Sequence, residues 1–190
     1  SFRHSPNSSK NNKDQERFLN IGNIFSSNRI GFEDSVEGGS SLTIGVDFDK
    51  KDNNNNSILS SSIATVFREK INLNLPTSST LGEKQSDFVG NINFIPNNKI
   101  SFDYDYSVDS GLDEVNLHKL KNTLKVNNFV NEFIFYEENN LIGKKSFFEN
   151  EITYNYNDAN KFSFKTRENK KENSTEFYNL IYQYETDCLI

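Results

Sequence analysis

The chain has 190 residues, of which 34% are hydrophobic and 25% are charged, and its net charge is −6. This negative charge, with basic residues scattered along the chain, argues against a nucleic-acid-binding protein. No apolar run approaches the roughly 20 residues that a membrane helix needs, and no basic-then-apolar stretch of the kind expected for a signal peptide is visible at the start. Because the chain begins with Ser and contains no Met, we expect a mature or internal segment, and export stays possible. The length suits one domain.

The first 40 residues predict a loop-rich segment, with a possible strand end at 1–4. Residues 5–17 are rich in Ser, Asn and Lys, which is typical of a solvated loop. The sequence Glu37-Gly38-Gly39 indicates a turn. From residue 41 to 190 we expect consecutive strands and loops that form a single partial domain.

The strand signal is clearest at residues 100–108, where every even position is apolar and every odd position is polar. Side chains alternate across a strand with a period of two, so this pattern predicts a strand with one aromatic face and one acidic face. Weaker versions of the pattern recur along the chain. The predicted strands are 41–49, 58–68, 86–95, 100–108, 115–126, 129–137, 147–156, 162–167 and 175–184. We expect a bulge at 119–122, where the alternation breaks.

The connections between these strands alternate in length. Short turns are predicted near residues 97, 127 and 158, and long loops at 71–85, 110–114, 139–145 and 168–174. Transmembrane β-barrels combine such alternation with strands of about 10 residues and aromatic residues near strand ends. The predicted fold is therefore all-β, an antiparallel up-and-down meander of about nine strands that is part of a larger transmembrane β-barrel. A soluble or surface-exposed β-sandwich, acting as an adhesion or carbohydrate-binding module, stays open as the alternative.

In the barrel, the two faces of each strand have different surroundings. Charged side chains are too costly to bury dry, so we expect the polar face to line a wet lumen and the apolar face to contact lipid. The residues predicted to face the lumen are Asp47, Asp49, Asp103, Asp105, Glu149, Glu151, Lys165 and Arg167. The residues predicted to face lipid are Ile100, Phe102, Tyr104, Tyr106, Val108, Ile152, Tyr154 and Tyr156.

No residue pattern indicates catalysis, a metal site or a cofactor. The acidic positions from Asp103 to Glu114 imitate the spacing of a calcium-binding EF-hand loop, but Val108 stands where the sharp turn needs Gly. His4 and His118 have no neighbours at ligand spacing, and Glu149 and Glu151 are read as part of a hydrated wall. We therefore expect no enzyme, no metal and no cofactor.

Three stretches in the same order resemble the C-terminal barrel of the LptD family, the outer-membrane lipopolysaccharide-assembly proteins also called organic solvent tolerance proteins (OstA). They are residues 28–39 (NRIGFEDSVEGG), 84–90 (KQSDFVG, before a strand with Pro96-Asn97) and 180–189 (LIYQYETDCL). The resemblance covers nearly the whole chain. Members of this family place a periplasmic jelly-roll domain before a large barrel, so the chain is expected to be an internal fragment.

The resemblance implies transport in the outer membrane of a Gram-negative bacterium. The implied partners are lipopolysaccharide, outer-membrane lipid, a plug lipoprotein in the lumen and periplasmic bridge proteins. Cys188 matches the late-barrel region where the family forms disulfides to its N-terminal domain, although many members carry two adjacent cysteines there and this chain has one. Cys188 is thus a candidate for a disulfide with a partner outside this chain, and an unpaired thiol is the alternative.

Overall fold

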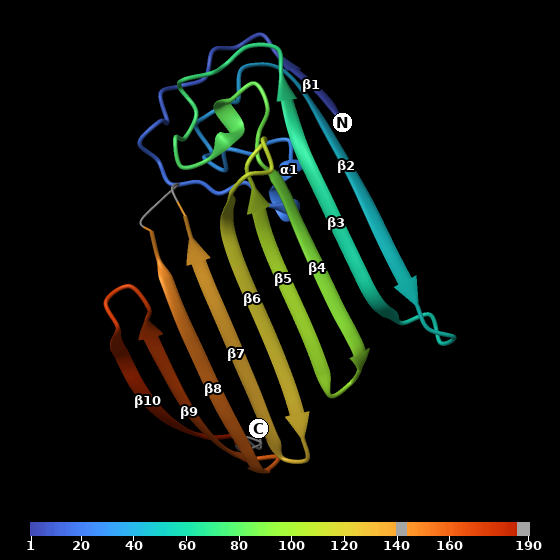
Figure 1. The fold of residues 1–190 in the computed structure, drawn as a ribbon, viewed down its shortest axis with the longest axis vertical. Coiled ribbons are helices and arrows are strands. Elements are labelled where there is room, and N and C mark those ends of the chain that lie inside the picture. Colours follow the sequence, from blue (N-terminus) through green and yellow to red (C-terminus); the bar gives the residue numbers. More distant parts are fainter. Residues whose placement is uncertain (140–143, 186–190) are drawn as a thin grey trace, which may run out of the picture.

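The computed structural model describes residues 1–139 and 144–185. This part of the chain forms one antiparallel sheet of ten strands, each paired with its neighbours in sequence (Figure 1). The prediction of an all-β up-and-down meander is therefore confirmed, with one strand more than expected. The strands are β1 (Phe2–Ser5), β2 (Gly39–Lys51), β3 (Ser57–Arg68), β4 (Phe88–Asn97), β5 (Ile100–Val108), β6 (Val115–Val126), β7 (Phe129–Glu138), β8 (Ser146–Asn157), β9 (Asn160–Asn169) and β10 (Ser174–Tyr184). The short helix α1 (Ile21–Ile24) and a 3-10 turn, Thr80–Gly82, lie in the long connections.

The connections differ between the two ends of the sheet. At one end, two-residue turns at 98–99, 127–128 and 158–159 join consecutive strands. Asn127 is the first residue of the turn between β6 and β7. Its φ is 50°, a conformation that Asn tolerates better than most residues. At the other end lie the two longest connections, 6–38 and 69–87. The sheet therefore has a tight-turn end and a long-loop end.

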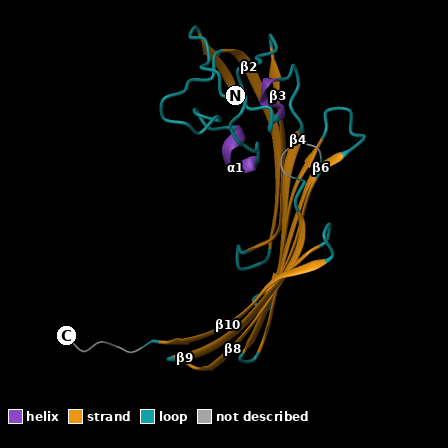
Figure 2. Cartoon of the chain, turned by 90° about the vertical axis from the view of Figure 1, so that its left-hand side faces the viewer, coloured by secondary structure: helices purple, strands orange, loops and turns teal. Residues whose placement is uncertain are grey.

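The sheet is strongly curved. In Figure 2 the strands β8 to β10 bend toward the side on which α1 and the N-terminal loops lie. We call this side the concave face and the opposite side the convex face. A coiled, twisted sheet of this kind has the shape of a section of a barrel wall.

The buried apolar core of the described residues lies on the concave face, under the two longest connections. The core is formed by three parts of the chain, namely the segment 6–38, the loop 69–87 and the strands β3 and β4. Its members are Leu19, Ile24, Ile30, Ala64, Val66, Leu75, Leu81 and Val89. The prediction of a solvated loop at 5–17 is wrong in part, because Ser9 and Asn12 are 7% and 8% exposed and hydrogen-bond within this core region.

The predicted bulge at 119–122 is also wrong. β6 pairs with β5 in unbroken register from Leu117 to Leu124, and the irregularity lies between Val115 and Leu117. The alternation fails at 119–122 because Asn122 takes a convex position among apolar neighbours, opposite Phe102. A polar residue on an apolar face imitates a shift in register.

No helix in the described ranges is long and apolar enough to cross a membrane.

Candidate functional site

A continuous row of directly opposed residues runs across the concave face. On the strands β2 to β9 the row contains, in order, Asp49, Ser60, Asn93, Asp103, Lys121, Ile134, Glu149 and Arg167. Side chains on one face of a sheet repeat every second residue, so a second row passes through Asp47, Asp105 and Lys119. All eight residues predicted to line a lumen therefore share one face of the sheet.

This shared face is the concave one. Gly45 lies between Thr43 and Asp47 on that face of β2, and a Cβ atom at Gly45 would lie 2.7 Å from the Phe25 ring. Phe25 immediately follows α1, whose side of the sheet is visible in Figure 2. Because Gly45 has no side chain, the ring of Phe25 can pack directly against the backbone of β2.

Amide–carboxylate pairs order the middle of the concave face. Asn91 donates to Asp105 over 2.7 Å, and Asn93 donates to Asp103 over 2.6 Å. Each pair joins directly opposed residues of β4 and β5. The carboxylates keep contact with water, since the side chain of Asp105 is 41% exposed.

Ion pairs continue this pattern on β8 and β9. Glu149 accepts hydrogen bonds from Arg167 Nε and Nη2 over 2.9 and 2.6 Å, and its other oxygen lies 2.7 Å from Lys165 Nζ. Lys165 also lies 3.7 Å from Glu151. Arg167 stacks over the Phe147 ring with its guanidinium carbon 4.5 Å from the centroid. The charges on this part of the face therefore neutralise one another across the strands.

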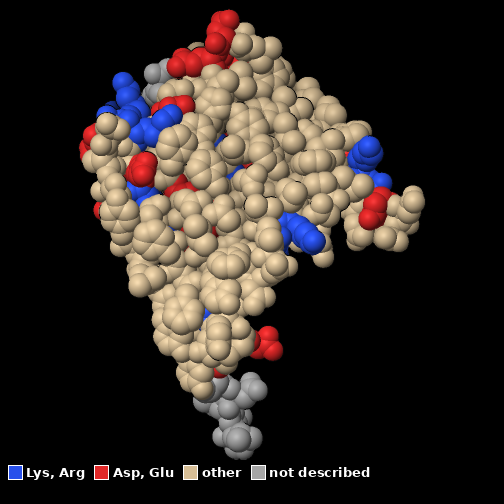
Figure 3. Space-filling model, turned by 60° about the horizontal axis from the view of Figure 1, so that its bottom comes forward, with Lys and Arg blue, Asp and Glu red and all other residues tan. Residues whose placement is uncertain are grey.

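Most aromatic side chains of the strands lie on the convex face, whereas Tyr136 and Phe147 lie on the concave face. The eight residues predicted to contact lipid lie on it, at positions that alternate with those of the concave rows. Rings pair across strands there, as in Phe129 with Tyr154 at 4.7 Å and Phe162 with Tyr182 at 4.8 Å between centroids. His118 also lies on this face, where its Nδ1 is 2.7 Å from the Tyr104 hydroxyl oxygen. Figure 3 shows a broad surface that is largely free of charged groups, with most Lys, Arg, Asp and Glu toward its margins.

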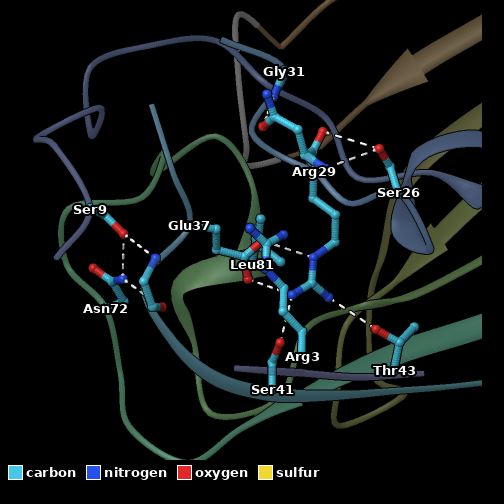
Figure 4. Close-up of polar contacts among 12 residues, drawn as sticks. Arg3, Ser9, Ser26, Arg29, Gly31, Glu37, Ser41, Thr43, Asn72 and Leu81 are labelled. Carbon is cyan, nitrogen blue, oxygen red and sulfur yellow. Dashed lines mark hydrogen bonds and ion pairs between the residues drawn. The ribbon is translucent and has the colours of Figure 1, made fainter. Parts of the chain in front are cut away.

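The segment 6–38 is fixed to the sheet by a buried carboxylate, Glu37. Its side chain is 1% exposed and accepts hydrogen bonds from three arginines (Figure 4). Arg29 binds it through Nε at 2.9 Å and Nη2 at 2.5 Å, Arg68 binds Oε1 through Nη2, and Arg3 lies 3.2 Å from Oε2. These arginines come from the segment itself, from β3 and from β1. One carboxylate thus joins three parts of the chain.

The other side-chain nitrogen atoms of the two buried arginines, Arg29 and Arg68, also have hydrogen-bond partners. Arg29 donates to the hydroxyls of Ser41 and Thr43 on β2, over 2.6 and 3.0 Å. Arg68 donates to the carbonyl oxygens of Leu81 and Gly38, over 2.6 and 3.1 Å. A buried charge is tolerated only when it is paired and fully hydrogen-bonded, and this network meets that requirement.

Glycine is required beside this network. Gly39 has a φ of 87°, and a Cβ atom at Gly38 would lie 2.2 Å from the backbone oxygen of Asn7. The turn predicted from Glu37-Gly38-Gly39 therefore brings the backbone of the segment against itself and leads into β2. The sequence identified the turn but not the role of Glu37, because nothing local marks its partners Arg3 and Arg68.

A second buried carboxylate lies in the stretch 84–90. Asp87 is 3% exposed and accepts hydrogen bonds from Ser107 Oγ at 2.9 Å and Asn116 Nδ2 at 2.8 Å. It therefore links the end of the loop 69–87 to β5 and β6. Both resemblance stretches that lie within the described residues thus contain a buried acid that joins a loop to the sheet.

The acidic positions with EF-hand spacing do not converge. Asp103 and Asp105 bond to asparagines on the concave face, whereas Asp109 closes the turn after β5. Asp109 accepts hydrogen bonds from the backbone N–H groups of Glu114, Gly111 and Asp113, and these bonds lower the pKa of its carboxyl. Within 1–139 and 144–185, no group of three or more potential metal ligands gathers at one point. Cys188, the disulfide candidate, lies outside the described residues.

Comparison with known protein families adds an identification to this geometry. The family model of LptD, described as LPS transport system D, matches residues 11–187. No curated protein matches the chain. The match includes both buried acids, all eight concave residues and the strands from β2 to β10. The family is one of lipopolysaccharide transport and outer-membrane assembly rather than of enzymes. The chain belongs to the LptD family.

Proposed function

We propose that this chain forms part of the wall of an outer-membrane β-barrel that conducts lipopolysaccharide and inserts it into the outer leaflet. The observation that carries the proposal is the separation of polarity between the two faces of a single curved sheet. Charged pairs such as Glu149 with Arg167 lie on the concave face, and paired rings such as Phe129 with Tyr154 lie on the convex face. Barrels of the outer membrane have a polar interior and an apolar outer band.

The two ends of the sheet support an orientation. Short turns are periplasmic and longer loops are extracellular in such barrels. The turns at 98–99, 127–128 and 158–159 would then face the periplasm, and the connections 6–38 and 69–87 would lie near the cell surface. In this orientation the segment 6–38 folds back from the outer end into the lumen, where Glu37 holds it.

A sandwich is a poor alternative for the described residues. A sandwich needs two sheets that pack their apolar faces together, whereas these strands form one sheet and leave large apolar side chains exposed. Val46, Phe48, Ile152 and Phe164 are 43% to 66% exposed on the convex face. Lipid contact accounts for this exposure, and an adhesion or carbohydrate-binding sandwich does not.

The partners follow from the same proposal. Lipopolysaccharide is the cargo, outer-membrane lipid surrounds the convex face, and a plug lipoprotein and periplasmic bridge proteins complete the machinery. Cys188 forms a disulfide with a cysteine outside this chain in this proposal. A Cys188→Ser variant of the full-length protein would then lose the mobility shift between reduced and oxidised samples in gel electrophoresis, and an unchanged shift would contradict the pairing.

A pair of matched variants tests the proposal. Phe102 lies on the convex face and Ser101, its neighbour on β5, lies on the concave face. Arg on the lipid side of a barrel costs about 2–4 kcal/mol near the bilayer midplane, whereas a polar lumen accepts it. In cells that depend on the full-length protein, Phe102→Arg should therefore block membrane assembly and surface lipopolysaccharide, and Ser101→Arg should not. Equal tolerance of both variants would contradict the proposal.

A further inference from the structure

A cleft lies between the segment 6–38 and the concave face of the sheet. Its volume is about 480 Å³, which is within the usual range for small-molecule sites. Phe18 and Gly22 line the cleft from the side of the segment, and Asp105, Lys119 and Tyr136 line it from the strands. The cleft depends on the docked position of the segment, because α1 forms one of its walls.

The floor of the cleft presents hydrogen-bonding groups that are only partly used. Asp105 accepts from Asn91 over 2.7 Å through one oxygen, and its second oxygen lies 3.5 Å from Lys119 Nζ. The side chains of Asp105 and Lys119 are 41% and 49% exposed. A carboxylate can accept about four hydrogen bonds and an ammonium group can donate three. Both groups can therefore bind a polar ligand.

The same cleft also has apolar lining residues on both sides. The rings of Phe18 and Tyr136 line it together with Leu117. A site with a few placed polar groups and an aromatic or apolar lining suits a ligand that has polar edges and an apolar face. A sugar ring has this character, because its hydroxyl groups project from the edge and its C–H bonds form a face.

The charges in the cleft disfavour binding of the phosphate groups and acyl chains of a glycolipid. Asp105 and Lys119 are one anion and one cation, and no further charged residue lines the cleft. A phosphate group on Lys119 would also lie beside the carboxylate of Asp105, which is 3.5 Å from that ammonium group, and the like charges oppose binding. An acyl chain would remove water from the ion pair without replacing its hydrogen bonds. An uncharged sugar avoids both costs.

We propose that this cleft is a binding subsite for an uncharged sugar residue of the transported glycolipid, with Asp105 and Lys119 binding hydroxyl groups and Tyr136 packing on the ring. This inference rests on the proposed transport function. It goes further by assigning the sugar portion, rather than the phosphates or acyl chains, to one place on the wall. The segment 6–38 then contributes to binding as well as covering the sheet.

The test uses the full-length protein purified in detergent. The probe is oligosaccharide released from lipopolysaccharide by mild acid and then dephosphorylated, with inorganic phosphate as the second probe. Saturation-transfer NMR should show the oligosaccharide bound and phosphate not bound. Asp105→Asn should weaken binding about tenfold, since hydrogen bonds to a charged group are stronger than neutral ones.

Two further variants make the test specific. Asp103→Asn is the matched control, because Asp103 lies on the same strand with the same kind of asparagine partner, at 2.6 Å, but outside the cleft. Its binding should equal that of the unmodified protein. Gly22→Leu should fill the cleft and abolish binding. The helix can accept this side chain, because the only atom that a Cβ atom at Gly22 would meet is Asn20 Oδ1, at 3.3 Å.

Surface lipopolysaccharide is also measured for every variant in cells that depend on the protein. The binding measurement then tests the subsite, and the surface measurement tests the proposed function. An unmodified protein that delivers lipopolysaccharide but does not bind the oligosaccharide would overturn the subsite alone. Equal binding by the unmodified protein and Asp105→Asn, or equal losses in Asp105→Asn and Asp103→Asn, would also overturn it. Failure of the unmodified protein to deliver lipopolysaccharide would instead overturn the proposed function.

Discussion

The concave face has two regions that treat charge in opposite ways. Beneath the segment 6–38, the carboxylate of Glu37 is 1% exposed and is bound by Arg29, Arg68 and Arg3. On β8 and β9, which this segment does not cover, the Glu149 side chain is also buried, at 7% exposed, but its partners Arg167 and Lys165 are 34% and 28% exposed and stay in contact with water. The first region is a closed network and the second is an open ladder.

The difference separates structural charge from charge that lines a passage. A buried ion pair costs several kcal/mol when one partner is lost, because the other charge remains without compensation. An exposed pair contributes about 0–1 kcal/mol, since water solvates either partner alone. Substitutions of charged residues in the covered region should therefore cost much stability, and those in the open region should cost little.

The largest effect is expected at Glu37. Replacing Glu37 with Gln leaves Arg29 and Arg68 buried without a counter-charge, and should weaken docking of the segment 6–38 by about 3–5 kcal/mol. Hydrogen exchange of the full-length protein would measure this as faster exchange throughout residues 6–38. Exchange confined to the neighbours of Glu37 would show that this carboxylate does not hold the segment.

A smaller effect in the same region is expected at Gly45. A Cβ atom there would lie 2.7 Å from the ring of Phe25, so Gly45→Ala should displace this ring and cost about 1–3 kcal/mol. The same exchange measurement should show faster exchange at α1 with β2 still protected. If β2 itself lost protection, the glycine would be required for the strand rather than for docking.

The open ladder should respond less. Glu149→Gln keeps the shape of the side chain and leaves Lys165 and Arg167, which are 28% and 34% exposed, in contact with water, so the expected loss is about 1–2 kcal/mol, below that of Glu37→Gln. Thermal unfolding of the purified protein, compared with Glu37→Gln, would measure it. A loss as large as that of Glu37→Gln would remove the distinction between the two regions.

The smallest effect concerns the turn that Asp109 closes, which lies outside both regions. Backbone hydrogen bonds from Glu114, Gly111 and Asp113 lower the pKa of this carboxyl, so it contributes stability above its unfolded pKa, and that contribution is lost as the pH falls through the folded pKa. Amide exchange at Gly111 and Asp113, corrected for its intrinsic pH dependence, should accelerate below that pKa. Asp109→Asn should abolish the pH dependence, and a persisting dependence would assign it to another group.

The same comparison explains what the sequence alone could predict. The strand 100–108 was predicted with the bounds that the structure has, because strict alternation depends only on residues near one another in sequence. The grouping of Asp103 with Glu149 on one face follows from the same period of two. The faces of the open region could therefore be predicted, whereas cross-strand pairs such as Glu149 with Arg167 depend on the register and could not.

The contacts of the covered region could not be predicted from the sequence. Glu37 and Arg68 are 31 positions apart, and Arg3 and Glu37 are 34 apart, so no local pattern reports their contact. The segment 6–38 has little periodicity, and its polar residues indicated a solvated loop although Ser9 and Asn12 are buried. The bulge predicted in β6 is absent for a related reason, since the convex position of Asn122 is set by pairing with β5 and β7 and not by its polarity.

The central claim is that the concave face lines a watery lumen and the convex face contacts lipid. The most direct test is a nitroxide scan of positions 100–108, one at a time, in the full-length protein reconstituted into liposomes. Collision rates with oxygen should be highest at Phe102, Tyr104 and Tyr106, and collision rates with a water-soluble nickel complex should be highest at Ser101, Asp103 and Asp105. Rates without this period of two, or with the two sets exchanged, would contradict the account.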